Sequence, residues 1–217
     1  MVLTLVLIGF LVLAAGVSVR WVLRRVDALG RIAPFPKLSV GLCVVVALGC
    51  AVPLALHARL EHTLQHAASQ VAGEPVHVDC QTSGQTWMDA GAELGYVKWG
   101  PGGVPEHRTL LKYDPCTDLR SWLSSNKNDP RLDQVIAVHV LTHETMHMVG
   151  ITDEAQAECA AMQRDAAMAV ALGATPAEGQ TLAHRYWLEV YPRMPDGYTG
   201  GCGPDSAWDE HLAAPPW

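Results

Sequence analysis

The chain has 217 residues, of which 49% are hydrophobic and 17% are charged, and its formal net charge at pH 7 is −7. This composition is compatible with one globular domain or with a smaller domain attached to membrane segments. Beyond residue 58, 10 Lys and Arg face 21 Asp and Glu, which gives a net charge of −11. Such an acidic domain argues against nucleic acid as a partner, because phosphate binding needs clustered Lys and Arg.

Residues 1–58 are predicted to form a membrane anchor of two helices. The runs 1–19 and 38–56 contain no charged side chain, and each is about as long as the ~20 residues of a spanning helix. We expect the first run to be retained rather than cleaved as a signal peptide, because the arginines follow it instead of preceding it. The loop between the runs is rich in Arg and contains one acid, Asp27, so it is predicted to be cytoplasmic. The chain is therefore expected to cross the lipid bilayer of the cell membrane twice, with residues 59–217 as an extracytoplasmic domain.

The cysteines fit this topology. Two of the six lie in the second apolar run and four lie in the exported part. An even number of cysteines in a compartment that permits oxidation predicts disulfides, with three possible pairings. Sequence order favours Cys80 with Cys116 and Cys159 with Cys202.

The exported part is predicted to have an α+β fold. A helical stalk at residues 58–69 precedes three short β-rich runs at 76–80, 95–99 and 107–112, which Gly and Pro clusters separate. We expect these runs to form a small antiparallel sheet that includes a hairpin.

Three helices are predicted to follow the sheet. Asp129 as the N-cap and Pro130 at the first helical position predict a helix over residues 131–149, which Gly150 can end in a left-handed conformation. A second helix is expected at 153–172, after Thr152 as its cap, and a third at about 175–190. The Pro- and Gly-rich tail beyond them is predicted to be mostly loop.

The first of these helices contains the sequence H-E-T-M-H at residues 143–147. His143 and His147 are separated by about 40° around the helix axis and about 6 Å along it, so both can bind one ion from the same side. Glu144 points away from that ion but can hold a water molecule bound to it. We predict Zn²⁺ bound by His143 and His147, with Glu144 as the catalytic base. His139 lies about 12 Å along the axis from His147, too far to share one ion, and is expected behind the ligands or packed in the core.

The series from His143 to Cys159 resembles the zincins, metallopeptidases built on an H-E-x-x-H helix beside a twisted sheet. It is also similar to a series in actinobacterial membrane proteins. These resemblances imply a zincin-like domain that hydrolyses peptide bonds in a peptide or protein substrate. Similarity to the metzincins implies Asp153 as the third ligand, with Met194 as the candidate for their methionine turn. Similarity to the gluzincins implies Glu154 or Glu158 on the following helix.

Helix periodicity ranks the three acids. The apolar stripe of the second helix is centred near Ala155, and Glu158 lies about 70° from it, against about 110° for Glu154 and about 150° for Asp153. A ligand that faces the core is therefore best provided by Glu158, with the other two left open. All three acids are also favoured at a helix start without any metal.

Two further questions stay open in the sequence. His184, Tyr186 and Tyr191 are candidates to stabilise a transition-state oxyanion, although each can simply pack in the core. The alternative to a peptidase is a non-catalytic binding module that the metal stabilises. A helix hairpin with core histidines and no metal is the third interpretation.

Overall fold

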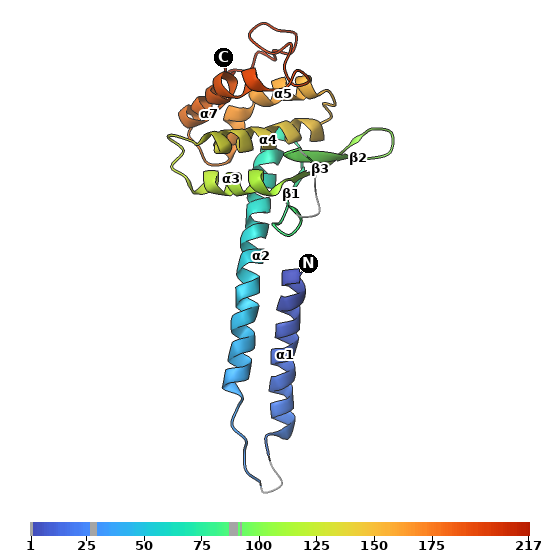
Figure 1. Ribbon diagram of the computed structural model, residues 1–217, viewed down its shortest axis with the longest axis vertical. Coiled ribbons are helices and arrows are strands. Elements are labelled where there is room, and N and C mark those ends of the chain that lie inside the picture. Colours follow the sequence, from blue (N-terminus) through green and yellow to red (C-terminus); the bar gives the residue numbers. More distant parts are fainter. Residues whose placement is uncertain (1, 27–29, 87–90, 92) are drawn as a thin grey trace. The chain divides into compact units, whose positions relative to one another are not determined.

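The computed structural model describes residues 2–26, 30–86, 91 and 93–217. The chain divides into two compact units, Met1–Arg59 and Leu60–Trp217. The architecture is mixed α+β, with two long apolar helices at the N-terminus and a small three-stranded sheet further along the chain (Figure 1).

The first unit contains α1 (Val2–Arg24) and the first part of α2 (Lys37–Ala72). Both helices are long and apolar enough to cross a membrane. Most of their large apolar side chains are exposed, such as Leu5 and Val12 on α1, and this is the surface that lipid covers in a spanning helix. The predicted loop residue Asp27 lies outside the described residues.

The sheet of the second unit has the strand order β1–β3–β2, with β1 at His77–Cys80, β2 at Gly95–Trp99 and β3 at Pro105–Leu111. Strands β2 and β3 form the predicted antiparallel hairpin. The prediction of a wholly antiparallel sheet is wrong, because β1 pairs parallel to β3. A disulfide joins Cys80, the last residue of β1, to Cys116, just beyond β3. It holds the carboxyl ends of the two strands together, which requires that they run in the same direction.

Helix α3 (Tyr113–Ser124) has no predicted counterpart and buries Leu119 and Trp122. Helix α4 (Leu132–Met148) corresponds to the predicted helix 131–149 and is buried over nearly its whole length. Its N-cap is Arg131 rather than Asp129, because the Arg131 N–H is bound by the Gln134 side chain while Asp129 stays exposed. In the second unit α4 contacts the sheet, α3 and the helices that follow it (Figure 1).

Gly150 ends α4 as predicted, with a φ of +105°. The N–H of Gly150 donates to the carbonyl of His147, and the N–H of Ile151 donates to the carbonyl of Met146. These are the two hydrogen bonds of a Schellman motif, which reverses the chain at a helix end. The reversal brings the next helix back alongside α4.

The predicted helix 153–172 is wrong in its continuity and in its cap. It consists of α5 (Glu154–Met162) and α6 (Asp165–Ala171), and Asp153 rather than Thr152 caps α5 by accepting from the N–H of Gln156. At the break, the side chain of Gln163 donates to the carbonyl of Trp208 in the C-terminal tail (residues 194–217). The break also turns Asp165 into the core.

Helix α7 (Pro176–Glu189) follows with the predicted start at Thr175 and Pro176, and the turn η2 (Tyr191–Arg193) leads into the tail. Both predicted disulfides are present, Cys80–Cys116 and Cys159–Cys202. The core of the second unit is formed by large buried side chains from α2, β3, α3, α4 and α7, among them Leu64, Leu111, Leu119, Trp122, Leu141 and Leu182. Each such side chain contributes about 1.5–3 kcal/mol through burial.

Candidate metal centre

The H-E-T-M-H segment of α4 lies at the wall of a cleft of about 450 Å³. One side of the cleft is formed by β2 and the other by the start of α5 and part of the tail. The lining includes His143, Glu144, His147 and Glu154. The two histidines and Glu144 are nearly buried, while the side chain of Glu154 is 50% exposed.

His143, His147 and Glu154, which we call the outer cluster, bring three ligand atoms together. The Nε2 atoms of His143 and His147 are 2.9 Å apart, and the Oε2 atom of Glu154 lies 3.2 Å from the first and 3.3 Å from the second. Zinc bonds of about 2.0–2.1 Å in a tetrahedral arrangement put ligand atoms roughly 3.3 Å apart. The outer cluster therefore has the size of one face of a tetrahedral zinc site.

The Nδ1 atoms of both histidines already have acceptors. His147 Nδ1 lies 2.7 Å from the carbonyl of Ile151, and His143 Nδ1 lies 3.1 Å from Oε2 of Glu158. A carbonyl and a carboxylate can only accept, so each Nδ1 carries a proton, and the Nε2 atoms are the nitrogens left to bind an ion or a second proton. Without an ion, a proton on Nε2 of His143 lies in the space between the two Nε2 atoms and Glu154, and a metal cation would take its place. Partners at Nδ1 orient metal-binding histidines in this way.

A second cluster lies behind His143. His139, Glu158 and Asp165, the inner cluster, are buried: His139 Nε2 is 2.9 Å from Glu158 Oε2 and Nδ1 is 2.8 Å from Asp165 Oδ2. Burial opposes a charge on His139, but the two carboxylates outweigh it and raise its pKa to about 10. Tyr186 donates to Glu158 Oε1 at 2.7 Å and stacks on the His139 ring. His139 is thus both packed in the core and placed behind the ligands.

Glu154, and not Glu158, lies within hydrogen-bond distance of the Nε2 atoms of both His143 and His147. Glu158 lies at the opposite edge of the His143 ring, and Asp153 is engaged in capping α5. The ranking of the three acids by their angle from the apolar stripe assumed that a metal ligand faces the core. The outer cluster instead lies at the boundary between core and cleft, where a half-exposed glutamate in the first turn of α5 can reach it.

The outer cluster attracts positive charge. Burial lowers the pKa of His143, but hydrogen bonds to Glu154 and Glu158 outweigh that effect and raise it to about 9. Burial and the neighbouring His143 lower the pKa of His147. The hydrogen bond to His143 lowers the pKa of Glu154 and keeps it ionised. The same electrostatic field stabilises a divalent cation at this position.

Glu144 faces the cleft from the residue next to His143. Burial raises its pKa to about 7, although His143 and a hydrogen bond from Thr109 oppose the shift. A carboxyl group that titrates near neutral pH is suited to both accepting and returning a proton.

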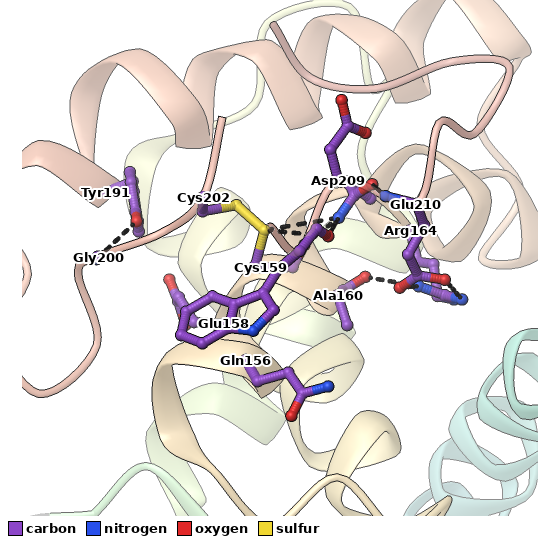
Figure 2. The surroundings of a disulfide bond; sticks show 12 residues. Gln156, Glu158, Cys159, Ala160, Arg164, Tyr191, Gly200, Cys202, Asp209 and Glu210 are labelled. Carbon is purple, nitrogen blue, oxygen red and sulfur yellow. Dashed lines mark hydrogen bonds and ion pairs between the residues drawn. A yellow bond between two sulfur atoms is a disulfide. The ribbon is translucent and has the colours of Figure 1, made fainter. Parts of the chain in front are cut away.

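The C-terminal tail completes the cleft. The Cys159–Cys202 bridge joins α5 to the tail beside Glu158 (Figure 2). Met194 and Tyr198 of the tail line the cleft, and the ring centroid of Tyr198 is 5.9 Å from that of His143. Tyr198 was missed in the sequence, although the predicted pairing of Cys159 with Cys202 already brings this segment to the helix that carries the acids.

The three predicted oxyanion candidates have different environments. Tyr186 lines the cleft but its hydroxyl is engaged by Glu158. His184 lies beside the carbonyl of Pro216, with its Nδ1 2.7 Å away, and is absent from the described lining of the cleft. Tyr191 stacks on Trp187 and accepts a hydrogen bond from the N–H of Gly200. Packing accounts for His184 and Tyr191.

Comparisons of the chain with protein-family models, with curated proteins and with solved structures give no match.

Proposed function

We propose that this chain is a membrane-anchored, zinc-dependent peptidase that hydrolyses peptide bonds outside the cytoplasm. The observation that supports it best is the triangle of two Nε2 atoms and one carboxylate oxygen in the outer cluster, next to Glu144 in an open cleft. His143, His147 and Glu154 would hold the ion, and Glu158 would orient His143. A zinc ion there supplies Lewis acidity toward a carbonyl and lowers the pKa of a water molecule.

Glu144 performs the proton transfers in this proposal. Its carboxylate accepts a proton from the attacking water and returns it to the amine that leaves. Burial raises the pKa of Glu144, which strengthens this carboxylate as a proton acceptor. Among the tail residues that line the cleft, Tyr198 is the one with a hydroxyl, and this phenol would donate to the developing oxyanion.

The neighbouring strand suits an extended substrate. In the sheet order, β2 lies at an edge, and Gly95, Tyr96 and Val97 line the cleft. A peptide in extended conformation can add to such an edge through main-chain hydrogen bonds. The two apolar helices and the two disulfides support placement of this cleft outside the cytoplasm on a two-pass anchor.

The test uses the full chain purified in detergent, its metal content and its hydrolysis of quenched fluorescent peptides of mixed sequence. The wild type is expected to hold about one zinc per chain. Glu144→Gln should keep the zinc and lose hydrolysis by about 10²- to 10⁴-fold. A wild-type chain that binds zinc and cleaves no peptide would favour the non-catalytic binding module. A chain that cannot be loaded with zinc would contradict both the peptidase and the metal-stabilised module.

A further inference from the structure

Thr109 is an unusual residue for its place in the sheet. It lies on the central strand β3 and pairs with Val78 on one side and Val97 on the other. It is 1% exposed, and among the buried residues of the described strands it is the only one with a polar side chain. Alternation along a strand favours an apolar residue at such a position. A hydroxyl buried there needs a hydrogen-bond partner.

The hydroxyl has two possible acceptors. Oγ1 of Thr109 lies 3.0 Å from the carbonyl of Tyr96 and 3.2 Å from Oε2 of Glu144. It carries one proton, and an ionised carboxylate is the stronger acceptor of the two. The Thr109 hydroxyl is therefore available to hold the Glu144 carboxylate from the sheet side.

Gly95 packs against the same carboxylate from β2. A Cβ atom at residue 95 would lie 2.9 Å from both Cγ and Oε1 of Glu144. This is closer than carbon atoms approach without displacement, so the absence of a side chain leaves the space that Glu144 occupies. The carboxylate is thus enclosed by the hydroxyl of one strand and the bare backbone of its neighbour.

We propose that Thr109 is a positioning residue for Glu144, with Gly95 providing the space in which the carboxylate sits. The inference rests on the proposed function, since it assigns to Thr109 the task of aiming the base of that reaction. Thr109 hydrogen-bonds to Glu144 and is absent from the described lining of the cleft, so its effect on the reaction would pass through Glu144. Its loss should lower kcat and leave KM and zinc content unchanged.

The decisive comparison uses three threonine variants of the full chain. Thr109→Val, which keeps the shape and removes the hydroxyl, is expected to lower kcat by about 10- to 100-fold with one zinc retained. Thr109→Ser, which restores the hydroxyl, should return kcat close to the wild-type value. Thr181→Val is the control for loss of a hydroxyl away from the cleft, because Thr181 donates to the carbonyl of Ala177 in its own helix and is absent from the described lining of the cleft. Equal kcat values for Thr109→Val and Thr181→Val would overturn the proposal.

A second variant and a second measurement keep the test independent of activity. Gly95→Ala should displace the carboxylate from the other side and also lower kcat without loss of zinc. In chain labelled with carboxyl-¹³C glutamate, the Glu144 signal is identified by its disappearance in Glu144→Gln. It should shift in Thr109→Val and return in Thr109→Ser. An unmoved signal overturns the role of Thr109, whereas zinc-loaded wild type that cleaves no peptide overturns the proposed function alone.

Discussion

The inner and outer clusters lie at opposite edges of the same imidazole ring, that of His143. The Nδ1 edge faces Glu158 of the inner cluster, and the Nε2 edge faces His147 and Glu154. Both clusters combine histidine with carboxylates at hydrogen-bond distance. They differ in where the neutralising charge lies: the inner cluster holds His139 between two buried carboxylates, whereas the outer cluster directs the Nε2 atoms of two histidines and one carboxylate oxygen at a single point beside the cleft.

The difference shows how similar residues give two kinds of site. A buried carboxylate must be paired with a charge that is always present, because an unpaired one is costly. A carboxylate at the edge of a cleft is partly hydrated and tolerates a cation that exchanges. The half-exposed Glu154 therefore suits a metal ligand, and the 1% exposed Glu158 suits a permanent ion pair.

The largest predicted effect is on stability, and it comes from a substitution in the inner cluster. Glu158→Gln leaves the imidazolium of His139 with one carboxylate in the core, and the free energy of unfolding of the zinc-free chain should fall by about 3–5 kcal/mol. Glu154→Gln is the matched change in the outer cluster. It should lower the free energy of unfolding by less than about 1 kcal/mol, because the Glu154 side chain is half exposed. Denaturant unfolding followed by tryptophan fluorescence measures both. Equal losses would mean that the two clusters do not differ in this way.

Zinc affinity should rank the same two variants in the reverse order. Glu154→Gln removes a ligand and is expected to weaken zinc binding by roughly 100- to 1,000-fold. Glu158→Gln removes only the partner of His143 and should weaken it by about 10- to 100-fold. Competition with a chelator of known affinity gives both values. A larger loss in Glu158→Gln would return the third-ligand role to Glu158.

The last prediction concerns pH. Because the pKa of His143 is raised to about 9 while that of His147 is lowered, one proton competes with zinc below pH 9. The apparent zinc affinity should therefore fall about tenfold for each pH unit below that value, down to about pH 7. Histidines with an ordinary pKa of about 6.5 would give a flat profile over the same range. Metal-buffered titrations at several pH values distinguish the two.

Much of the fold could be predicted because it depends on local signals. Gly150 and the Thr175–Pro176 start mark helix ends through backbone conformation and capping, and the order of the exported cysteines matched the two bridges. The parallel pairing of β1 and the break after Met162 depend on contacts with residues far along the chain. No pattern within either segment indicates them.

The candidate site divides in the same way. His143, Glu144 and His147 share one helix, so a five-residue spacing was enough to place them together. The ranking of Glu154 below Glu158 followed from treating the ligand as a core residue. Thr109 and Tyr198 come from a strand and a tail that only the folded chain brings to α4. A polar residue at a buried strand position is the signal by which Thr109 could have been found.

Gly150 has no side chain, but it is as important to the proposed metal centre as a ligand is. Its left-handed conformation places the carbonyl of Ile151 against Nδ1 of His147, and this contact decides which nitrogen of that ring faces the cleft. Any residue with a Cβ atom would be strained at this φ. The geometry of the proposed metal centre therefore depends on how α4 ends. A substitution of Gly150 would disturb that geometry although every proposed ligand is still present.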